Sequence, residues 1–178
     1  VIPLVFGEVF KFIIDPACTT VFEAETEEAD IMERKPRSIK TRLFNTKADT
    51  ISDIQGIVAL ALVIVVYLYA NSMSLGIDTA RTMAFTTIVL TNIALIITNR
   101  SWKLSIIGIF RRPNKAFWQI LTLALIALLL VIYVPPLSGL FQFTALAPLD
   151  LLICLMAGFG SIIWFEVCKV VKHGRLVA

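Results

Sequence analysis

The sequence predicts an all-α fold, a polytopic membrane bundle of about five transmembrane helices. Composition is the first reason: of 178 residues, 58% are hydrophobic and only 16% are charged, and the mean hydropathy is +0.85. Soluble domains carry roughly 25% charged residues, and a domain of this size leaves roughly 30% of its chain surface exposed. This much apolar surface therefore requires lipid as its solvent. The second reason is that the charges divide the chain into long uncharged intervals separated by basic loops.

The spans are placed in the uncharged intervals, because a bilayer core needs roughly 20 mostly apolar helical residues. The first span, near 2–22, is apolar but contains three charged residues. The second, near 54–76, lies in an interval of 24 uncharged residues, and the third, near 80–99, in one of 18. The fourth, near 116–134, ends at a double proline, which does not continue a helix. The fifth, near 149–170, fills the next apolar interval and extends past two charges.

Orientation follows from Lys and Arg, which concentrate in cytoplasmic loops. Residues 23–52, the loop after the third span and the tail after the fifth are basic, whereas the two remaining loops hold almost no basic residues. This alternation predicts an integral membrane protein with Val1 outside, 23–52 as a cytoplasmic loop and Ala178 in the cytoplasm. Because topology accounts for the basic loops, nucleic acid is not expected as a partner.

Three charged residues of the first span, Glu8, Lys11 and Asp15, share one helix face at spacings i, i+3 and i+7. Charges in a spanning helix are costly and often mark a pathway for ions or protons. Pro16 removes a backbone hydrogen bond, so freed carbonyls beside the Asp15 carboxylate favour a cation site. The alternative is a permanent salt bridge of Lys11 with the two carboxylates, and Glu8 can also lie in water near the outer interface.

Polar and small residues mark two of the later spans. Asn92, near the middle of the third span, either supplies an uncharged oxygen to a cation or forms an interhelical hydrogen bond worth roughly 0.5–2 kcal/mol. Gly158 and Gly160 predict close helix packing in the fifth span. Glu166, toward the end of that span, is expected to lie in water or to cap a helix.

Motifs for soluble catalysis do not occur in the sequence. His173 is the only histidine, so a histidine-based metal site or a Ser-His-Asp triad is unsupported. No GxxxxGK[ST] phosphate-binding loop is present. We therefore expect neither catalytic nor cofactor-binding residues in this chain. Its three widely spaced cysteines predict buried apolar side chains and no disulfide framework.

A family resemblance is carried by residues 12–37, FIIDPACTTVFEAETEEADIMERKPR. This segment resembles the sixth transmembrane helix and following cytoplasmic loop of cation-transporting P-type ATPases, especially a bacterial, calcium-pump-like branch with a DPAC...FEAE...DIMxRxPR pattern. The order of the later spans, the basic loop ending in RRPNKAFW and the double proline agree with it. The resemblance covers essentially the whole chain. It implies that residues 1–178 form the C-terminal transmembrane domain, helices six to ten of ten, in a bacterial plasma membrane.

In that family an aspartate of the sixth helix coordinates the transported cation, and the resemblance places Asp15 at that position. The family's calcium pumps have an amide side chain four residues earlier and a threonine one residue earlier, where this chain has Lys11 and Ile14. They also have a glutamate in the eighth helix, where this chain has Asn92. These differences favour fewer ions than a two-ion calcium site, or a proton-like ion, with Lys11 and Glu8 as internal counter-charges.

The family's phosphorylation motif and nucleotide domain do not occur in this sequence, so this chain alone should neither hydrolyse ATP nor pump. The resemblance implies that the N-terminal half of the pump is missing from this sequence. ATP and Mg²⁺ are expected as cofactors of the full-length pump. The first residue, which is not Met, agrees with such a piece. The expected partners are that half, the lipid bilayer and the transported cation (calcium, a proton or another). An ATP-independent channel or carrier and a structural membrane subunit remain as alternatives.

Overall fold

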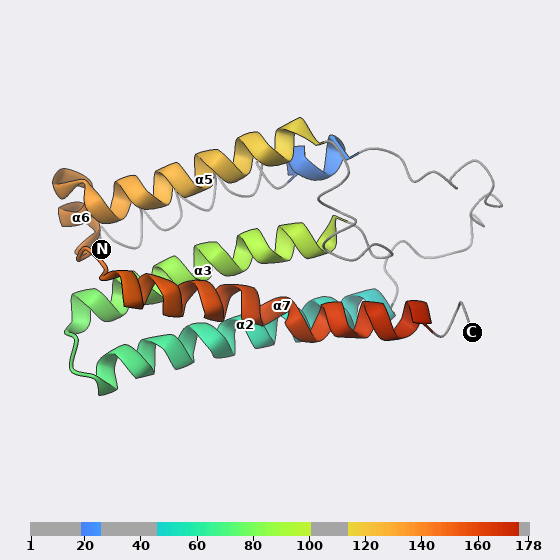
Figure 1. Ribbon diagram of the computed structural model, residues 1–178, viewed down its shortest axis with the longest axis horizontal. Coiled ribbons are helices and arrows are strands. Elements are labelled where there is room, and N and C mark those ends of the chain that lie inside the picture. The colour runs from blue at the N-terminus through green and yellow to red at the C-terminus, as the bar shows by residue number, and fades with distance from the viewer. Residues whose placement is uncertain (1–18, 26–45, 101–113, 175–178) are drawn as a thin grey trace.

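The computed structural model describes residues 19–25, 46–100 and 114–174, which Figure 1 draws as coloured ribbon. For residues 46–49, 164–165 and 167–174 the description is limited to the backbone. The described parts of the chain are helical and contain no strand, which confirms the all-α fold class. The predicted first span falls outside this description except for residues 19–22, which are helical.

Five helices have defined bounds. They are α2 (Thr46–Ser72), α3 (Ile77–Asn99), α5 (Lys115–Tyr133), the short α6 (Pro135–Phe141) and α7 (Pro148–Gly174). Within the described ranges, α2, α3 and α5 are long and apolar enough to cross a membrane, and α7 contributes a shorter apolar stretch over Pro148–Ile163. Four helices of the bundle thus occupy the intervals predicted for the second to fifth spans.

The connection between α2 and α3 differs from the prediction. Helix α2 ends at Ser72, and its last carbonyls are satisfied by two backbone bonds, from Ser74 N to Asn71 O at 3.1 Å and from Leu75 N to Ala70 O at 3.2 Å. Ser74 takes the left-handed conformation, with φ 54°, that such a C-terminal cap requires. Uncharged residues form this turn, so a map of charges does not locate it. At its other end α2 begins at Thr46, inside the predicted loop 23–52, because a helix can continue beyond the lipid.

Helix α3 is the central element of the described bundle. In Figure 1 it lies between α5 and the pair formed by α2 and α7, and its most extensive contacts are with α7 and then α2. In its most apolar window 61% of the residues are buried, against 11% for α2 and 22% for α5. Helices α2 and α5 therefore turn most of their apolar side chains outward, as lipid-facing helices do.

Two apolar cores lie on opposite sides of α3. One joins α3 to α5 and to the helical turn at residues 19–23: Val21, Val89, Ile93, Ile97, Phe117, Leu128 and Ile132. The other joins α3 to α2 and to α7 with its preceding loop: Val66, Ala70, Ala80, Met83, Leu90, Leu146 and Cys154. Because α3 contributes to both, a displacement of α3 disturbs every other helix that packs on it.

Close packing of α3 on α7 depends on Gly158. A Cβ atom at this position would lie 2.8 Å from Leu90 Cβ and 3.2 Å from the backbone nitrogen of Thr91. The prediction of close packing is thus confirmed for Gly158 and wrong for Gly160, where a Cβ atom would meet nothing within 4 Å. Two glycines two residues apart lie on different faces of a helix, and only one of these faces meets α3.

The double proline begins a helix as well as ending one. Val134 is extended, with φ −90° and ψ 113°, and Pro135 then opens α6, where its missing N–H is harmless. Helix α6 ends at Phe141, and the side chain of its C-cap residue, Gln142, accepts a 2.7 Å hydrogen bond from Arg81 of α3. Tyr133 donates a hydrogen bond to the carbonyl of Leu146 at 3.1 Å. These contacts hold the connection from α5 to α7 against the start of α3, and we name this region the α6 end of the bundle.

Candidate functional site

The four predicted site residues divide into one that the structure describes and three that it does not. Asn92 lies on α3. Glu8, Lys11 and Asp15 lie outside the described residues. Their predicted grouping on one helix face, and the distance from Asp15 to Asn92, therefore remain predictions.

The half of α3 that precedes Asn92 carries three threonines whose hydroxyls donate within the helix. The hydroxyls of Thr82, Thr86 and Thr87 donate to carbonyls four residues earlier at 2.7, 2.7 and 2.8 Å. Such back-bonding is the ordinary way in which a threonine is accommodated in an apolar helix. The protons of these three hydroxyls are thus used within α3, and the Thr82 oxygen also accepts a hydrogen bond from the backbone N–H of Thr144 at 3.0 Å.

The middle of α3 is different. Thr91 is 2% exposed, and its Oγ1 atom is the one buried side-chain oxygen or nitrogen without a hydrogen-bond partner in the described residues. Asn92, the next residue, is half-buried, and its amide forms no hydrogen bond in the same part of the chain. The interhelical hydrogen bond considered for Asn92 is therefore not seen there. Thr91 and Asn92 are consecutive residues at mid-helix, so their side chains leave the helix in different directions. The Thr91 hydroxyl is the buried group without a partner among the described residues, a state that is rare.

A second polar region lies at the opposite end of the bundle from α6. We name it the Arg100 cluster and define it as Glu25, Arg100, Asn114 and Phe117. The Arg100 guanidinium donates to both carboxylate oxygens of Glu25, from Nε at 2.8 Å and from Nη2 at 3.2 Å. The Arg100 side chain is 1% exposed and that of Glu25 16%. The guanidinium carbon also lies 4.6 Å from the centre of the Phe117 ring, a distance at which cation and ring attract.

Asn114 completes the cluster with three hydrogen bonds. Its Nδ2 donates to Glu25 Oε2 at 2.8 Å and to the carbonyl of Val21 at 3.1 Å. Its Oδ1 accepts from the backbone N–H of Phe117 at 2.9 Å and so caps the start of α5. Val21 belongs to the last helical turn before Glu25, where carbonyls lack partners within the helix. The Asn114 amide therefore forms hydrogen bonds both with the end of the helical turn at residues 19–23 and with the start of α5.

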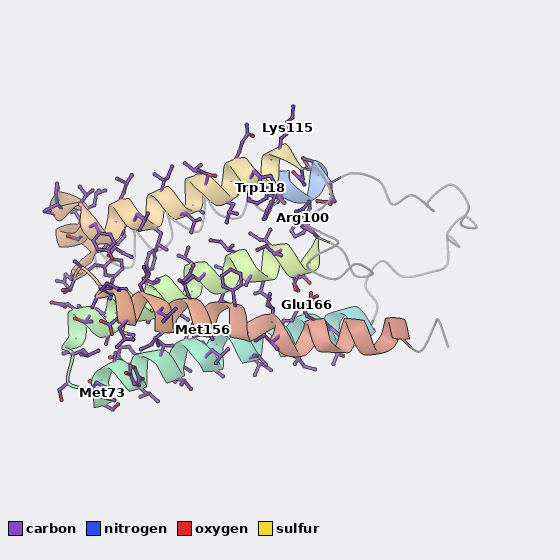
Figure 2. All side chains as sticks on the ribbon, viewed as in Figure 1. Met73, Arg100, Lys115, Trp118, Met156 and Glu166 are labelled. Carbon is purple, nitrogen blue, oxygen red and sulfur yellow. The ribbon has the colours of Figure 1, made fainter. Side chains whose placement is uncertain are left out.

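The ends of three helices meet at this cluster. Arg100 caps the C-terminus of α3, where a cation is favoured by the helix dipole. Figure 2 shows Arg100 close to the first turn of α5, which carries the labelled Lys115 and Trp118. Figure 1 shows residues 19–25 beside the same turn. The cluster thus joins the segment that follows the predicted first span to α3 and α5.

Two further polar contacts connect α3 to its other neighbours near the same end. Thr98 donates to Glu166 Oε1 of α7 at 2.6 Å, and the side-chain amides of Gln55 and Asn99 approach to 3.5 Å between α2 and α3. The expectation that Glu166 lies in water or caps a helix was wrong, because its half-buried carboxylate faces the bundle and accepts this bond.

Sequence reasoning used Arg100 only as a topology signal and gave Glu25 and Asn114 no role. The pairs they form span 75 and 89 positions of the chain, so no local pattern reveals them. One signal was available: Asn114 precedes the uncharged interval of the fourth span, and asparagine in that place favours an N-cap. In the part of the chain that the structure describes, no three His, Cys, Asp or Glu side chains gather to hold a metal ion.

Comparison with known families gives one match. Residues 9–171 match a family described as "Cation transporting ATPase, C-terminus". The matched range includes Lys11, Asp15 and Asn92, together with the Arg100 cluster. No match was found among curated proteins.

Proposed function

We propose that this chain, which belongs to the family of cation-transporting ATPase C-termini, supplies two ligands for the transported cation, Asp15 and Asn92. Membership of the family makes the chain the C-terminal membrane part of a cation-transporting P-type ATPase, and its apolar helices agree with that place in a membrane. The finer assignment is to helices six to ten of a bacterial, calcium-pump-like branch. It rests on the segment 12–37 and on the order of the helices.

The observation that carries the proposal is the unsatisfied polar pair in the middle of α3. The Thr91 hydroxyl is buried without a partner among the described residues, and the Asn92 amide beside it has none there either. Leaving the buried Thr91 hydroxyl unpaired costs about 1–3 kcal/mol, which a bound cation with its water would offset. Neutral oxygens of this type ligate hard cations together with carboxylates.

Asp15 supplies the charge that Asn92 lacks. A carboxylate within the bilayer needs a counter-charge, and in the proposed site this is the transported cation, assisted by Lys11. Glu8 lies on the same predicted face and balances Lys11 when the cation is absent. With a lysine already in the site, the net negative charge suits one small cation or a proton better than two calcium ions.

In the complete pump, ATP and Mg²⁺ bind outside this chain and supply the free energy. Alternation between two conformations changes the affinity at Asp15 and Asn92, because a change of state has to bring a change in ligand contacts. The residues of this chain bind and release the cation and exclude lipid from it. In a bacterial plasma membrane, we place Val1 on the outer side and Ala178 on the cytoplasmic side, because Lys and Arg concentrate in the loops assigned to the cytoplasm.

Asn92→Leu in the full-length pump tests the α3 half of the proposed site. We expect the cation concentration for half-maximal phosphorylation by ATP to rise about tenfold, since one neutral ligand contributes roughly 1.4 kcal/mol. Phosphorylation is measured at varied free Ca²⁺ and, separately, at varied pH. Asn99→Leu is the matched control, because this amide lies on the same helix but contacts Gln55. An equal effect of the two substitutions would show that Asn92 is not a ligand.

Lys11→Met tests the counter-charge. In the proposed site, this substitution removes the counter-charge of the Asp15 carboxylate. We therefore expect the pH dependence of cation-stimulated phosphorylation, or the number of ions carried per ATP, to change. Identical pH profiles and transport ratios in the variant and the parent would leave Lys11 with a structural role only.

A further inference from the structure

We propose that the outward face of α5 binds one anionic phospholipid, with the lipid phosphate at Lys115 and an acyl chain in a groove that follows it along the helix. This lipid site is separate from the proposed cation site and consists of residues that the structure describes. Only the choice of leaflet depends on the proposed function, because Lys115 lies at the cytoplasmic surface in the proposed orientation.

The first observation is a groove on the surface of α5, which we name the α5 groove. It has a volume of about 460 Å³ and is lined by Trp118, Gln119, Thr122, Leu123 and Ile126. Counted from Lys115, these residues follow at i+3, i+4, i+7, i+8 and i+11, so they share one helix face with the lysine. All six side chains are exposed. The other face of α5 packs on α3 through Phe117, Leu128 and Ile132, and the α5 groove therefore faces away from the bundle.

The second observation is that this face begins with a cation. Lys115 is the only charged residue of α5, and it forms no ion pair with any described residue. Figure 2 shows its side chain extending away from the other helices. One turn further, the exposed Gln119 amide forms no hydrogen bond in the same part of the chain. An ammonium group and an amide both donate hydrogen bonds, so this end of the face suits the oxygens of a phosphate.

The third observation is that the face becomes apolar with distance from Lys115. Thr122 contributes a hydroxyl, and Leu123 and Ile126 then contribute hydrocarbon alone. From Lys115 to Ile126 the helix rises roughly 16 Å at 1.5 Å per residue, which is about half of a 30 Å bilayer core. A polar end followed by an apolar groove, within one leaflet, matches a single phospholipid. Trp118 lies near the polar end, where an amphipathic ring is favoured.

The composition of the face favours a lipid over a further transmembrane helix as the occupant. Helices associate in membranes through small residues, which let their backbones approach closely. The five residues of the α5 groove include no Gly, Ala or Ser, and the three alanines that follow Lys115 in α5 do not line it. A flexible acyl chain fits between large side chains without such an approach. The positive charge of Lys115 selects an anionic headgroup, because one lysine near the membrane surface is worth about 1 kcal/mol toward anionic lipid.

The experiment counts lipids bound to the detergent-solubilised full-length pump by native mass spectrometry. Phosphatidylglycerol, which is anionic, and phosphatidylcholine, which is zwitterionic, are titrated separately. We expect the parent pump to bind one phosphatidylglycerol about fivefold more tightly than phosphatidylcholine, the factor that one lysine supplies. Lys115→Gln should remove this preference, and Lys115→Arg should keep it. Equal affinities of the parent for the two lipids, or an unchanged preference in Lys115→Gln, would overturn the proposal.

Leu123→Trp tests the groove itself, because the larger ring fills the space assigned to the acyl chain. We expect the affinity for both lipids to fall about fivefold or more. Leu125→Trp is the matched control, since it adds the same ring to an exposed residue of α5 that does not line the groove. Equal effects of the two substitutions contradict the proposed site. Release of a copurifying protein by Leu123→Trp, with lipid binding unchanged, would identify a protein as the occupant and also contradict it.

The lipid measurement needs neither ATP nor a transported cation, so its outcome is distinct from that of the proposed cation ligands. Asp15→Asn should bind phosphatidylglycerol with the affinity of the parent pump. Loss of lipid binding in this variant would show that the lipid site is not separate from the cation site. Lys115 and Leu123 are exposed and belong to neither apolar core, so their variants should keep the thermal stability of the lipid-free parent.

Discussion

Asp15→Asn in the full-length pump is expected to abolish phosphorylation stimulated by the transported cation. The substitution keeps the size of the side chain and removes its charge, so the site loses its anionic ligand while the fold is retained. In a medium of low dielectric constant, the loss of an opposite charge costs far more than it does in water. An affinity decrease of more than about 100-fold, or roughly 2.7 kcal/mol, places the site outside the usual range of cation concentrations.

The measurement is phosphoenzyme formed from ATP across a series of free Ca²⁺ concentrations and, separately, of pH values. Asp53→Asn is the matched control, since Asp53 is an exposed carboxylate of α2. It should behave like the parent pump. Normal cation-stimulated phosphorylation in Asp15→Asn would remove this residue from the site, whatever the state of Asn92.

Gly158→Val is expected to have the largest effect on the bundle itself. Even one added carbon atom would lie 2.8 Å from Leu90 Cβ and 3.2 Å from the Leu90 carbonyl carbon. The second of these is backbone, which does not rotate away, so α3 and α7 must separate. Overpacking of this kind costs roughly 1–3 kcal/mol and sometimes more. The cost is raised here because α3 also carries the core shared with α5.

The thermal stability of the detergent-solubilised pump measures this effect, and the expected result is a clear decrease for Gly158→Val. Gly160→Val serves as its control, because the same side chain on the same helix meets open space within 4 Å. If the two variants are equally stable, the close contact of α3 and α7 does not limit the packing of the protein.

The fold class followed from the sequence because lipid imposes a simple rule on composition. Long uncharged intervals located both ends of α3, α5 and α7 and the C-terminal end of α2 to within a few residues. The start of α2 was the exception, because this helix begins at Thr46, inside the predicted loop. The rule is insensitive to features made from uncharged residues. It missed the turn after Ser72, which depends on a left-handed Ser74, and it missed the short helix α6 that Pro135 begins.

The predicted cation ligands stay a prediction, because Asp15 lies outside the described residues. The linear sequence shows a charged residue within an apolar interval directly, and Lys11 and Asp15 were predicted as site residues for that reason. A polar pair between distant segments is visible only after folding, as Glu25 and Arg100 demonstrate. Gly158 and Gly160 are indistinguishable in sequence, and the face that α7 turns toward α3 decides between them.

The described geometry gives α3 three separate tasks. Its N-terminal half satisfies its own hydroxyls, its middle leaves Thr91 and Asn92 available, and its C-terminal end holds Glu25 through Arg100. A helix with free polar groups at one depth and a rigid contact at another is compatible with the proposed cation site.

The most direct test of the account is cation movement in liposomes that contain the full-length pump. Calcium uptake and internal pH are followed with ATP, with a non-hydrolysable ATP analogue, and with ATP for the Asp15→Asn variant. The account predicts that a cation accumulates only when the parent pump hydrolyses ATP. Cation flux that is independent of ATP, or accumulation that survives Asp15→Asn, would contradict it.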